Sequence, residues 1–401
     1  MNLFLLATFV YRFANGLLFL AVAWSLVRSG DGGAMPLALS AIGGFVPAVV
    51  AAPFARRLLE RVDTCKLTLW GIAGLCVCAL SFVPLLHVPF AVLATNFVVL
   101  SIFFLLEGAW DALLAVIANG LPSAQGDKLN SRQSAATQAG LMLGGLPLGL
   151  LIRTGGSAAP FVAAAGLYVI ALLLFALPAL RRVTKSAQRK NADQTNAART
   201  ADSDTQAIKP AWTTLATLAL VWPCLTLVNM VMPLVANSQG GGTVEHAAVL
   251  DASIGLGMAC IGVAYEKLMR LPVRSQKYTI LVALVFIPLP FFALLAMSYW
   301  LPVLGIAFFL CGVGFGMLRV SVRKQLIATQ PAHRVGQIVA SCNAYGFPVL
   351  ALLALLYARS WQLGPFVPLA AFFAIAVIGG ATLLGKPVRE RIRAGVTTDV
   401  G

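Results

Sequence analysis

The stretch Phe90–Ala118, FAVLATNFVVLSIFFLLEGAWDALLAVIA, is longer than the roughly 20 apolar residues that cross the core of a bilayer as one helix. Its only charged residues are Glu107 and Asp111. Because they are one helical turn apart, the two carboxylates share one face of the predicted helix. A charge at the centre of a membrane costs roughly 3 kcal/mol or more, so such residues normally face the interior of a helix bundle and have a function there.

The rest of the chain repeats this apolar pattern. Of its 401 residues, 59% are hydrophobic and 11% are charged, against about 25% charged in a typical soluble domain. Helix-length apolar runs lie at Leu3–Val27, Pro36–Phe54, Leu67–Leu86, Phe90–Ala118, Ser134–Ile152, Ala158–Leu180, Trp212–Val235, Ala247–Tyr265, Tyr278–Met297, Leu301–Val322, Val335–Ala358 and Phe366–Leu384. We therefore predict an all-α membrane protein with twelve transmembrane helices.

The distribution of positive charge predicts the topology. The net charge of +15 comes from 29 Lys and Arg against 14 Asp and Glu. Most of the basic residues follow even-numbered helices, as do Arg56, Arg57 and Arg61 after the second and Lys128 and Arg132 after the fourth. By the positive-inside rule, both termini are cytoplasmic, and the basicity does not indicate nucleic-acid binding. The first apolar run is too long for a signal peptide, so we expect a retained helix in a multi-pass protein of a bacterial-type inner membrane.

One long polar interval, Arg181–Lys209, has no aromatic residue and cannot bury an apolar face, so it is predicted to be a linker. The segments FARRLLERVDTCKLT, after the second helix, and AYEKLMRLPVRSQKYT, after the eighth, share their pattern of charged and apolar positions. Such a repeat indicates two pseudo-symmetric six-helix bundles. The predicted boundaries are an N-terminal bundle at 1–180, a cytoplasmic linker at 181–210, a C-terminal bundle at 211–388 and a cytoplasmic tail at 389–401.

The sequence carries no signature of an enzyme. A nucleotide-binding P-loop, a GxSxG motif and an HExxH motif are all absent. The seven cysteines show no CxxC spacing and the three histidines lie far apart, so neither group predicts a metal site. We expect a protein that is not an enzyme and has no cofactor.

Two segments resemble a known family. NGLPSAQGDKLNSRQSAATQAGLMLGGLPLGLL, Asn119–Leu151, is similar to the stretch that joins helices four and five in exporters of the major facilitator superfamily, including the enterobactin exporter and lysophospholipid transporter families. GVGFGMLRVSVRKQLIATQPAHRVGQIVAS, Gly312–Ser341, resembles the join of helices ten and eleven. The resemblance implies a major facilitator fold, in which helices one, four, seven and ten line a central cavity that opens to each side in turn.

The sequence also departs from the pattern of this superfamily. The Arg that many drug antiporters hold in helix four is absent, and Phe104 stands at its expected position, which counts against a standard drug/proton antiporter. The acidic residue of the loop between helices two and three is missing as well, and only the basic character of that loop remains.

A counter-charge for the acidic pair is available in the first helix. Arg12 and Asp111 both lie about 12 to 13 Å from the predicted cytoplasmic ends of their helices, at 1.5 Å per residue. We therefore expect an ion pair of Arg12 with Asp111 or Glu107, and we expect the acids to hold at least one proton between them. Proton coupling or substrate contact is one interpretation of this set, and a buried pair that only fixes helix packing is the other.

Other polar residues within the apolar runs are candidates for the cavity, with ordinary interhelical or interfacial contacts as the alternative. These candidates are Asn15, Trp110, Gln138, Asn229, Asp251, Arg319 and Asn343. Small residues and prolines that could permit bending or only close packing are Gly140, Gly144, Gly145, Pro147, Gly346 and Pro348. Trp110 could stack on an organic substrate.

The expected function is secondary active transport by alternating access. On the resemblance, we expect proton-coupled export of a small polar or amphipathic organic molecule, such as a siderophore-type metabolite or a drug-like compound. A lysophospholipid flippase and a proton-coupled nutrient importer are the alternatives. The expected partners are this substrate, the proton and the lipid bilayer, and we expect a monomer.

Overall fold

The computed structural model describes residues 2–28, 33–50, 64–119, 123–177, 211–239, 243–268, 270–296, 300–329 and 332–384. Within these ranges the regular structure is helical, and no strand is present. Arg56, Arg57 and Arg61, the predicted linker at 181–210 and the predicted tail at 389–401 lie outside the described residues.

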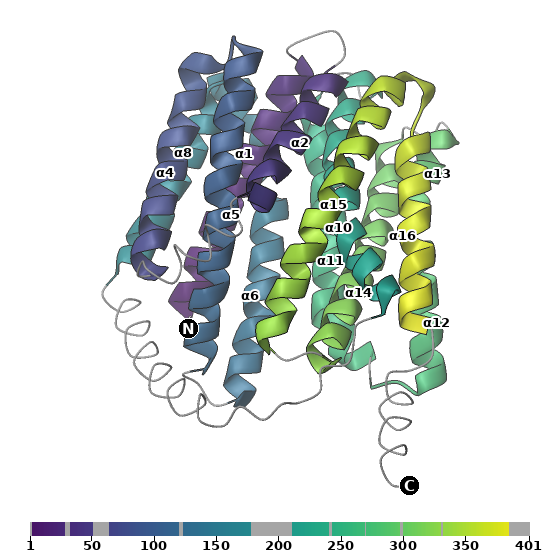
Figure 1. The fold of residues 1–401 in the computed structure, drawn as a ribbon. Helices are drawn as coiled ribbons and strands as arrows, with labels where there is room; N and C mark the ends of the chain where they lie inside the picture. The colour runs from purple at the N-terminus through teal and green to yellow at the C-terminus, as the bar shows by residue number, and fades with distance from the viewer. Residues whose placement is uncertain are drawn as a thin grey trace, which may run out of the picture. The chain divides into compact units, whose positions relative to one another are not determined.

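The N-terminal half forms the helices α1 (Asn2–Arg28), α2 (Ala34–Val50), α4 (Thr64–Leu85), α5 (Pro89–Asn119), α6 (Ser123–Leu143), α7 (Leu148–Gly155) and α8 (Ala159–Ala176) (Figure 1). The C-terminal half forms α10 (Trp212–Gln239), α11 (Val244–Leu268), α12 (Val273–Val285), α13 (Leu289–Leu295), α14 (Leu301–Thr329), α15 (Ala332–Ser360), the short 3-10 helix η1 (Trp361–Leu363) and α16 (Phe366–Leu384). The predicted all-α fold is confirmed.

Eleven helical segments in the described part of the chain are long and apolar enough to cross a membrane, and Ala34–Pro47 is a shorter apolar helix. In lipid, every backbone polar group needs an internal hydrogen bond, so uninterrupted apolar sequence of this length folds as helix. The protein is therefore a multi-pass membrane protein.

Two of the predicted helices differ from expectation. The fifth begins at Ser123 rather than Ser134, so Lys128 and Arg132 lie within α6 and not in a loop. The polar sequence SAQGDKLNSRQ forms the first turns of α6, and its backbone groups are hydrogen-bonded within the helix. Because these turns are polar, the apolar pattern predicted only the later part of the helix. The fifth helix is also broken between α6 and α7, and the ninth between α12 and α13, where Pro147, Pro288 and Pro290 lack the N–H that a continuous helix would use.

By its internal contacts the chain divides into two compact units. Unit 1 contains Met1–Asp204 and Asn229–Leu256, and unit 2 contains Thr205–Val228 and Gly257–Gly401. The C-terminal part of α10 and the N-terminal part of α11 therefore belong to unit 1, together with α1 to α8.

Unit 1 is built around α1, which packs along α6 and α8. Glycines allow its backbone to approach that of α6 closely. A Cβ atom on Gly16 would overlap with the carbonyl oxygen of Leu141, and one on Gly144 would overlap with that of Phe13. Gly140 likewise lies against the carbonyl oxygen of Phe9. These small residues set the distance between the two helices.

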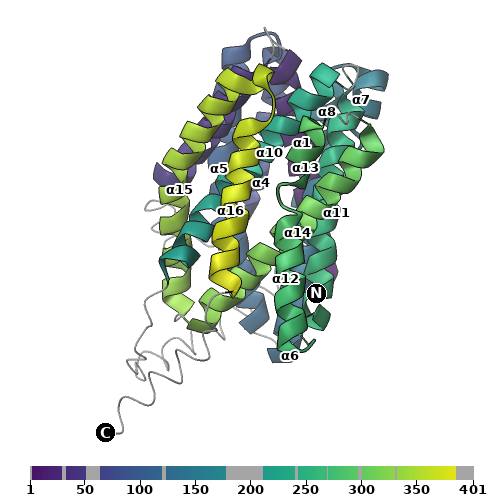
Figure 2. The ribbon, with the colours of Figure 1, turned by 90° about the vertical axis from the view of Figure 1, so that its right-hand side faces the viewer.

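In unit 2, α14 packs against α12 and α13, and α16 packs against α12 and α15 (Figure 2). The ring of Phe372 lies 4.6 Å from that of Phe291 and 5.2 Å from that of Phe315, so α16 is joined to α13 and α14 by edge-to-face aromatic contacts. Gly346 lies where a Cβ would overlap with the carbonyl oxygen of Ala219, and Pro348 lies inside α15.

The close approach of α1 and α6 predicts the effect of a single methyl group. Gly16→Ala should lower the thermal unfolding temperature of the purified protein in detergent, because overpacking of this kind costs about 1 to 3 kcal/mol. Gly166→Ala is the matched control, since nothing lies within 4 Å of a Cβ at this helical position. It should leave stability unchanged or raise it by up to about 1 kcal/mol. Equal effects of the two substitutions would contradict the packing of α1 on α6.

Candidate functional site

Arg12 lies in the middle of α1 and is almost completely buried, with 4% of its side chain exposed. Its guanidinium carbon lies 5.4 Å from the ring centroid of Tyr11 and 5.6 Å from that of Phe103, within the range of cation–π attraction. Arginine does not lose its proton inside a protein, so this position needs an anion nearby.

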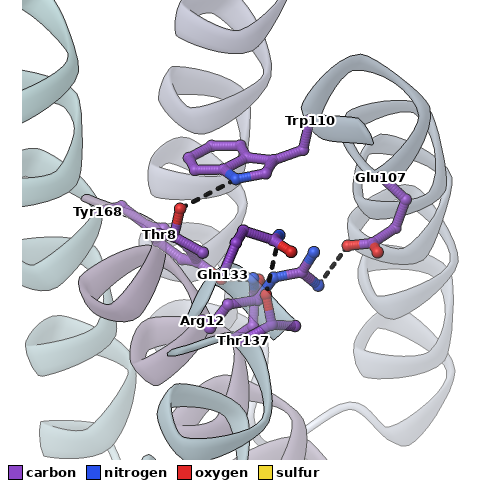
Figure 3. A network of polar contacts seen from close by, with 8 residues as sticks. Thr8, Arg12, Glu107, Trp110, Gln133, Thr137 and Tyr168 are labelled. Atoms are coloured by element: carbon purple, nitrogen blue, oxygen red, sulfur yellow. Dashed lines mark hydrogen bonds and ion pairs between the residues drawn. The ribbon is translucent and has the colours of Figure 1, made fainter. Parts of the chain in front are cut away.

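Glu107 of α5 supplies that anion. Its Oε1 forms an ion pair with Nη1 of Arg12, and 33% of the glutamate side chain is exposed (Figure 3). One member of the pair is therefore enclosed by protein while the other is open on one side. The sequence left two acids as partners for Arg12, and the structure forms the pair with Glu107. Asp111 lies in α5 one turn further on, but its side chain is outside the described part of the structure.

Trp110 holds α5 against α1 on the neighbouring face. The indole is fully buried, and its Nε1 donates a hydrogen bond of 3.1 Å to Oγ1 of Thr8 (Figure 3). Its ring stacks on that of Tyr11 at 4.8 Å and on that of Phe4 at 5.9 Å, and it contacts Phe175 of α8 at 5.3 Å. Protein side chains thus surround the indole, which contributes to the packing of α1, α5 and α8.

A second hydrogen bond joins α1 to α8. The buried hydroxyl of Tyr168 donates to Oδ1 of Asn15 over 2.8 Å. Asn15 was a candidate for the cavity, and the structure places it fully buried between two helices of unit 1. A buried amide of this kind needs a partner, because an unsatisfied polar group costs about 1 to 3 kcal/mol.

The face of α6 that meets Arg12 is polar. Gln133, Thr137 and Gly140 follow the i, i+4, i+7 spacing of one helix face, and a Cβ on Gly140 would lie 2.8 Å from Cβ of Arg12. The amide of Gln133 donates to the hydroxyl of Thr137 over 3.1 Å (Figure 3). Hydrogen-bonding groups of α6 therefore approach the ion pair, and they add polar surface to the site.

The remaining candidates lie in other places. Gln138 of α6 and Arg319 of α14 are partly exposed, and the side chain of Asn343 is outside the described part of the structure. Asn229 of α10 and Asp251 of α11 both line one cavity in unit 1. Sequence reasoning thus named two polar groups that the structure brings together at this cavity.

Sequence reasoning missed Thr8, Tyr11, Gln133, Thr137 and Tyr168. A signal for the first two was available, because Thr8, Tyr11, Arg12 and Asn15 follow the i, i+3, i+4, i+7 spacing of one face of α1. Nothing in the sequence links Tyr168 to Asn15, which are 153 positions apart.

Comparison with known families identifies the fold. The sequence profile described as Major Facilitator Superfamily matches residues 4–355. The chain belongs to this superfamily. It is therefore a membrane transport protein, as the resemblance implied. No match was found among curated proteins.

Solved structures of transporters are similar over nearly the whole chain. A POT family transporter in complex with a thioalcohol-conjugated peptide has a TM-score of 0.68 at 12% identity, covering 96% of this chain and 94% of the other. The POT family transporter PepTSo has a TM-score of 0.67 at 12% identity, with 96% of each chain covered. The nucleoside transporter NupG has a TM-score of 0.63 at 14% identity, covering 96% of this chain and all of the other. At such low identities the likeness concerns the fold alone.

The packing of Trp110 generates a prediction. Thr8→Val removes the acceptor of the buried indole N–H and should lower the free energy of unfolding by about 1 to 3 kcal/mol. Thr154→Val is the matched control, because the exposed hydroxyl of Thr154 bonds only within its own turn, to the carbonyl oxygens of Leu150 and Leu151. Its effect should be close to zero. Thermal unfolding in detergent compares the two variants, and a Thr8→Val protein as stable as the control would contradict the role of this hydrogen bond.

Proposed function

We propose that this protein is a proton-coupled exporter of a small polar or amphipathic organic molecule, and that Arg12 and Glu107 form its coupling site. The observation that supports this proposal most directly is the ion pair between an almost fully buried cation and a carboxylate with one third of its side chain exposed. A pair that served packing alone could be replaced by well-packed apolar residues at little or no cost in stability.

The asymmetry of the pair suggests how coupling works. Arg12 keeps its charge throughout, whereas Glu107 can accept a proton from hydronium and become a neutral carboxylic acid, with water released. Protonation removes the compensation of a buried cation, which costs several kcal/mol unless another anion replaces it or the helices rearrange. A cationic or hydrogen-bond-donating group of the substrate can bind the ionised carboxylate of Glu107 and is released when this carboxylate takes up a proton. Proton and substrate then compete for one carboxylate, as exchange of the two across a membrane requires.

Other polar residues extend the proposed site. Asp111 shares the face of α5 with Glu107 by its one-turn spacing and is proposed as a second proton acceptor. Gln138, Arg319 and Asn343 are proposed to contact the substrate. Alternating access through the motion of the two six-helix bundles would complete the cycle. The proposed location is a bacterial-type inner membrane with both termini in the cytoplasm, and the proposed state is a monomer.

The proposed cargo and the proposed direction of transport rest on the resemblance of two segments to exporter sequences. The similarity of Asn119–Leu151 and Gly312–Ser341 to exporter sequences favours export, with a siderophore-type metabolite as the first cargo to test. The structures of similar fold are named for peptides and nucleosides, so these compounds belong in the same ligand panel. Lysophospholipids belong there as well, since flippase activity is the alternative within the exporter group.

Glu107→Gln is the test of the coupling site. A thermal-shift panel of catecholate siderophores, short peptides, nucleosides and lysophospholipids first selects the compound that stabilises the purified wild-type protein. In proteoliposomes, the flux driven by a pH gradient should fall at least about tenfold in Glu107→Gln, because an amide cannot take up a proton. The same fall is expected in the double variant that combines Glu107→Gln with Asp111→Asn. Counterflow, which needs no gradient, should persist.

Glu245→Gln is the matched control. Glu245 is an acid of α11 that pairs with Arg153 of α7, and both side chains are substantially exposed. This variant should transport as the wild type does. Unchanged pH-driven flux in the variants of Glu107 and Asp111 would refute the assigned role, and gradient-driven uptake in the direction opposite to export would refute the proposed direction.

A further inference from the structure

Unit 1 contains a cavity of about 80 Å³ whose polar lining comes from two side chains, Asn229 of α10 and Asp251 of α11. The rest of its lining is apolar and includes Leu20 of α1 and Met142 of α6. A cavity that holds one water molecule needs about 10 to 15 Å³ by this measure, so there is room here for a few waters or for a small hydrated ion. Asn229, one of these two polar side chains, is exposed.

The carboxylate of Asp251 forms no hydrogen bond and no ion pair within the described part of the chain. Two basic groups of the helices around it pair with other acids: Arg153 of α7 pairs with Glu245 over 2.7 Å, and Arg12 of α1 pairs with Glu107. Arg28 of α1, Arg132 of α6 and Lys267 of α11 are exposed. Asp251 is partly buried, and a carboxylate lined mainly by apolar side chains is costly to keep charged, which favours a bound proton or a bound cation.

His246 precedes Asp251 by five residues on α11. Its Nδ1 lies 2.6 Å from the hydroxyl of Thr243, so this imidazole is held by the first turn of the helix rather than by Asp251. Among the described residues, no basic side chain of these helices forms an ion pair with Asp251.

The carboxylate lies beside the break in the fifth helix. A Cβ on Gly145 would lie 3.5 Å from Oδ2 of Asp251. In a continuous helix the N–H groups of Leu146 and Leu148 would bond to the carbonyls of Met142 and Gly144. Here Leu146 bonds to Leu143 and Leu148 bonds to Gly145, each over 3.1 Å.

The carbonyl oxygens of Met142, which lines the cavity, and of Gly144 therefore lack their usual helical donors. Backbone carbonyls at the breaks of discontinuous membrane helices are good ligands for cations, and small hard cations prefer oxygen ligands from carboxylates, amides and carbonyls. The break at Gly144–Pro147 and the unpaired Asp251 are separate observations that point to the same ligand chemistry.

We infer that Asp251, Asn229 and the broken α6–α7 segment form a binding site for a monovalent cation, which is a proton delivered by hydronium or a sodium ion. A proton converts the carboxylate of Asp251 to the neutral acid and leaves one water in the cavity. A sodium ion instead takes oxygen ligands from Asp251, Asn229 and the carbonyls of the break. This site uses none of the residues of the Arg12–Glu107 pair, and the inference does not depend on the direction or cargo of transport.

The test measures thermal unfolding of the purified full-length protein in detergent. In one arm, sodium chloride replaces choline chloride at constant ionic strength and alkaline pH. In the other arm, the pH falls from alkaline to mildly acidic in choline chloride alone. A cation that binds only the folded state should raise the unfolding midpoint of the wild type by about 2 °C or more in at least one arm.

In the Asp251→Asn variant the side chain at position 251 is neutral at every pH. This variant should be more stable than the wild type in choline chloride at alkaline pH, and it should not show the rise in unfolding midpoint that the wild type shows. Glu245→Gln, which replaces an acid of the same helix outside the cavity, should retain that response.

The sodium arm identifies an alkali cation, and a response confined to the pH arm identifies the proton. A wild type that responds in neither arm would overturn the inference. An Asp251→Asn variant that responds as strongly as the wild type would overturn it as well. Since all readouts are binding measurements, they are independent of the transport assay with Glu107→Gln.

Discussion

A buried arginine that cannot lose its charge is the constraint on which the structure of unit 1 depends. Arg12 lies mid-way along α1 with 4% of its side chain exposed, so α5 must bring Glu107 to it. The two side chains are not equally enclosed, because one third of the glutamate side chain is exposed, although the oxygen that pairs with Arg12 is itself buried. Since only the glutamate can be neutralised by a proton, the pair converts a protonation event into an uncompensated charge between helices. This property links the energetics of helix packing to the proposed transport cycle.

The surroundings of the pair hold α1 in one register. Gly16, Gly140 and Gly144 let α1 and α6 approach until backbone touches backbone, and Trp110 fixes α5 through its bond to Thr8. Asp251 is the contrasting case within the same unit, because this acid has a cavity in place of a basic partner. The two acids thus differ: Glu107 pairs with Arg12, whereas a cation from solution is proposed as the partner of Asp251.

The sequence predicted the all-α membrane fold, because apolar runs of bilayer length permit little else. It also predicted that Arg12 would meet an acid of the fourth helix, since equal depth from the same membrane face can be counted along each helix. It could not choose between Glu107 and Asp111, because that choice depends on the rotation of α5 about its axis. The start of α6 at Ser123 could not be predicted from apolar runs, because the first turns of this helix are polar. The hydrogen bond from Tyr168 to Asn15 could not be predicted either, because it depends on packing between distant segments.

Exchanging the two charges tests the central claim most directly. Arg12→Glu and Glu107→Arg each place two like charges together in the interior, so each variant alone should unfold at a much lower temperature than the wild type. Combined, they restore opposite charges, and the double variant should recover much of the loss, with a coupling free energy of about 1.5 kcal/mol or more. Single variants as stable as the wild type, or losses that simply add in the double variant, would contradict a direct ion pair between α1 and α5.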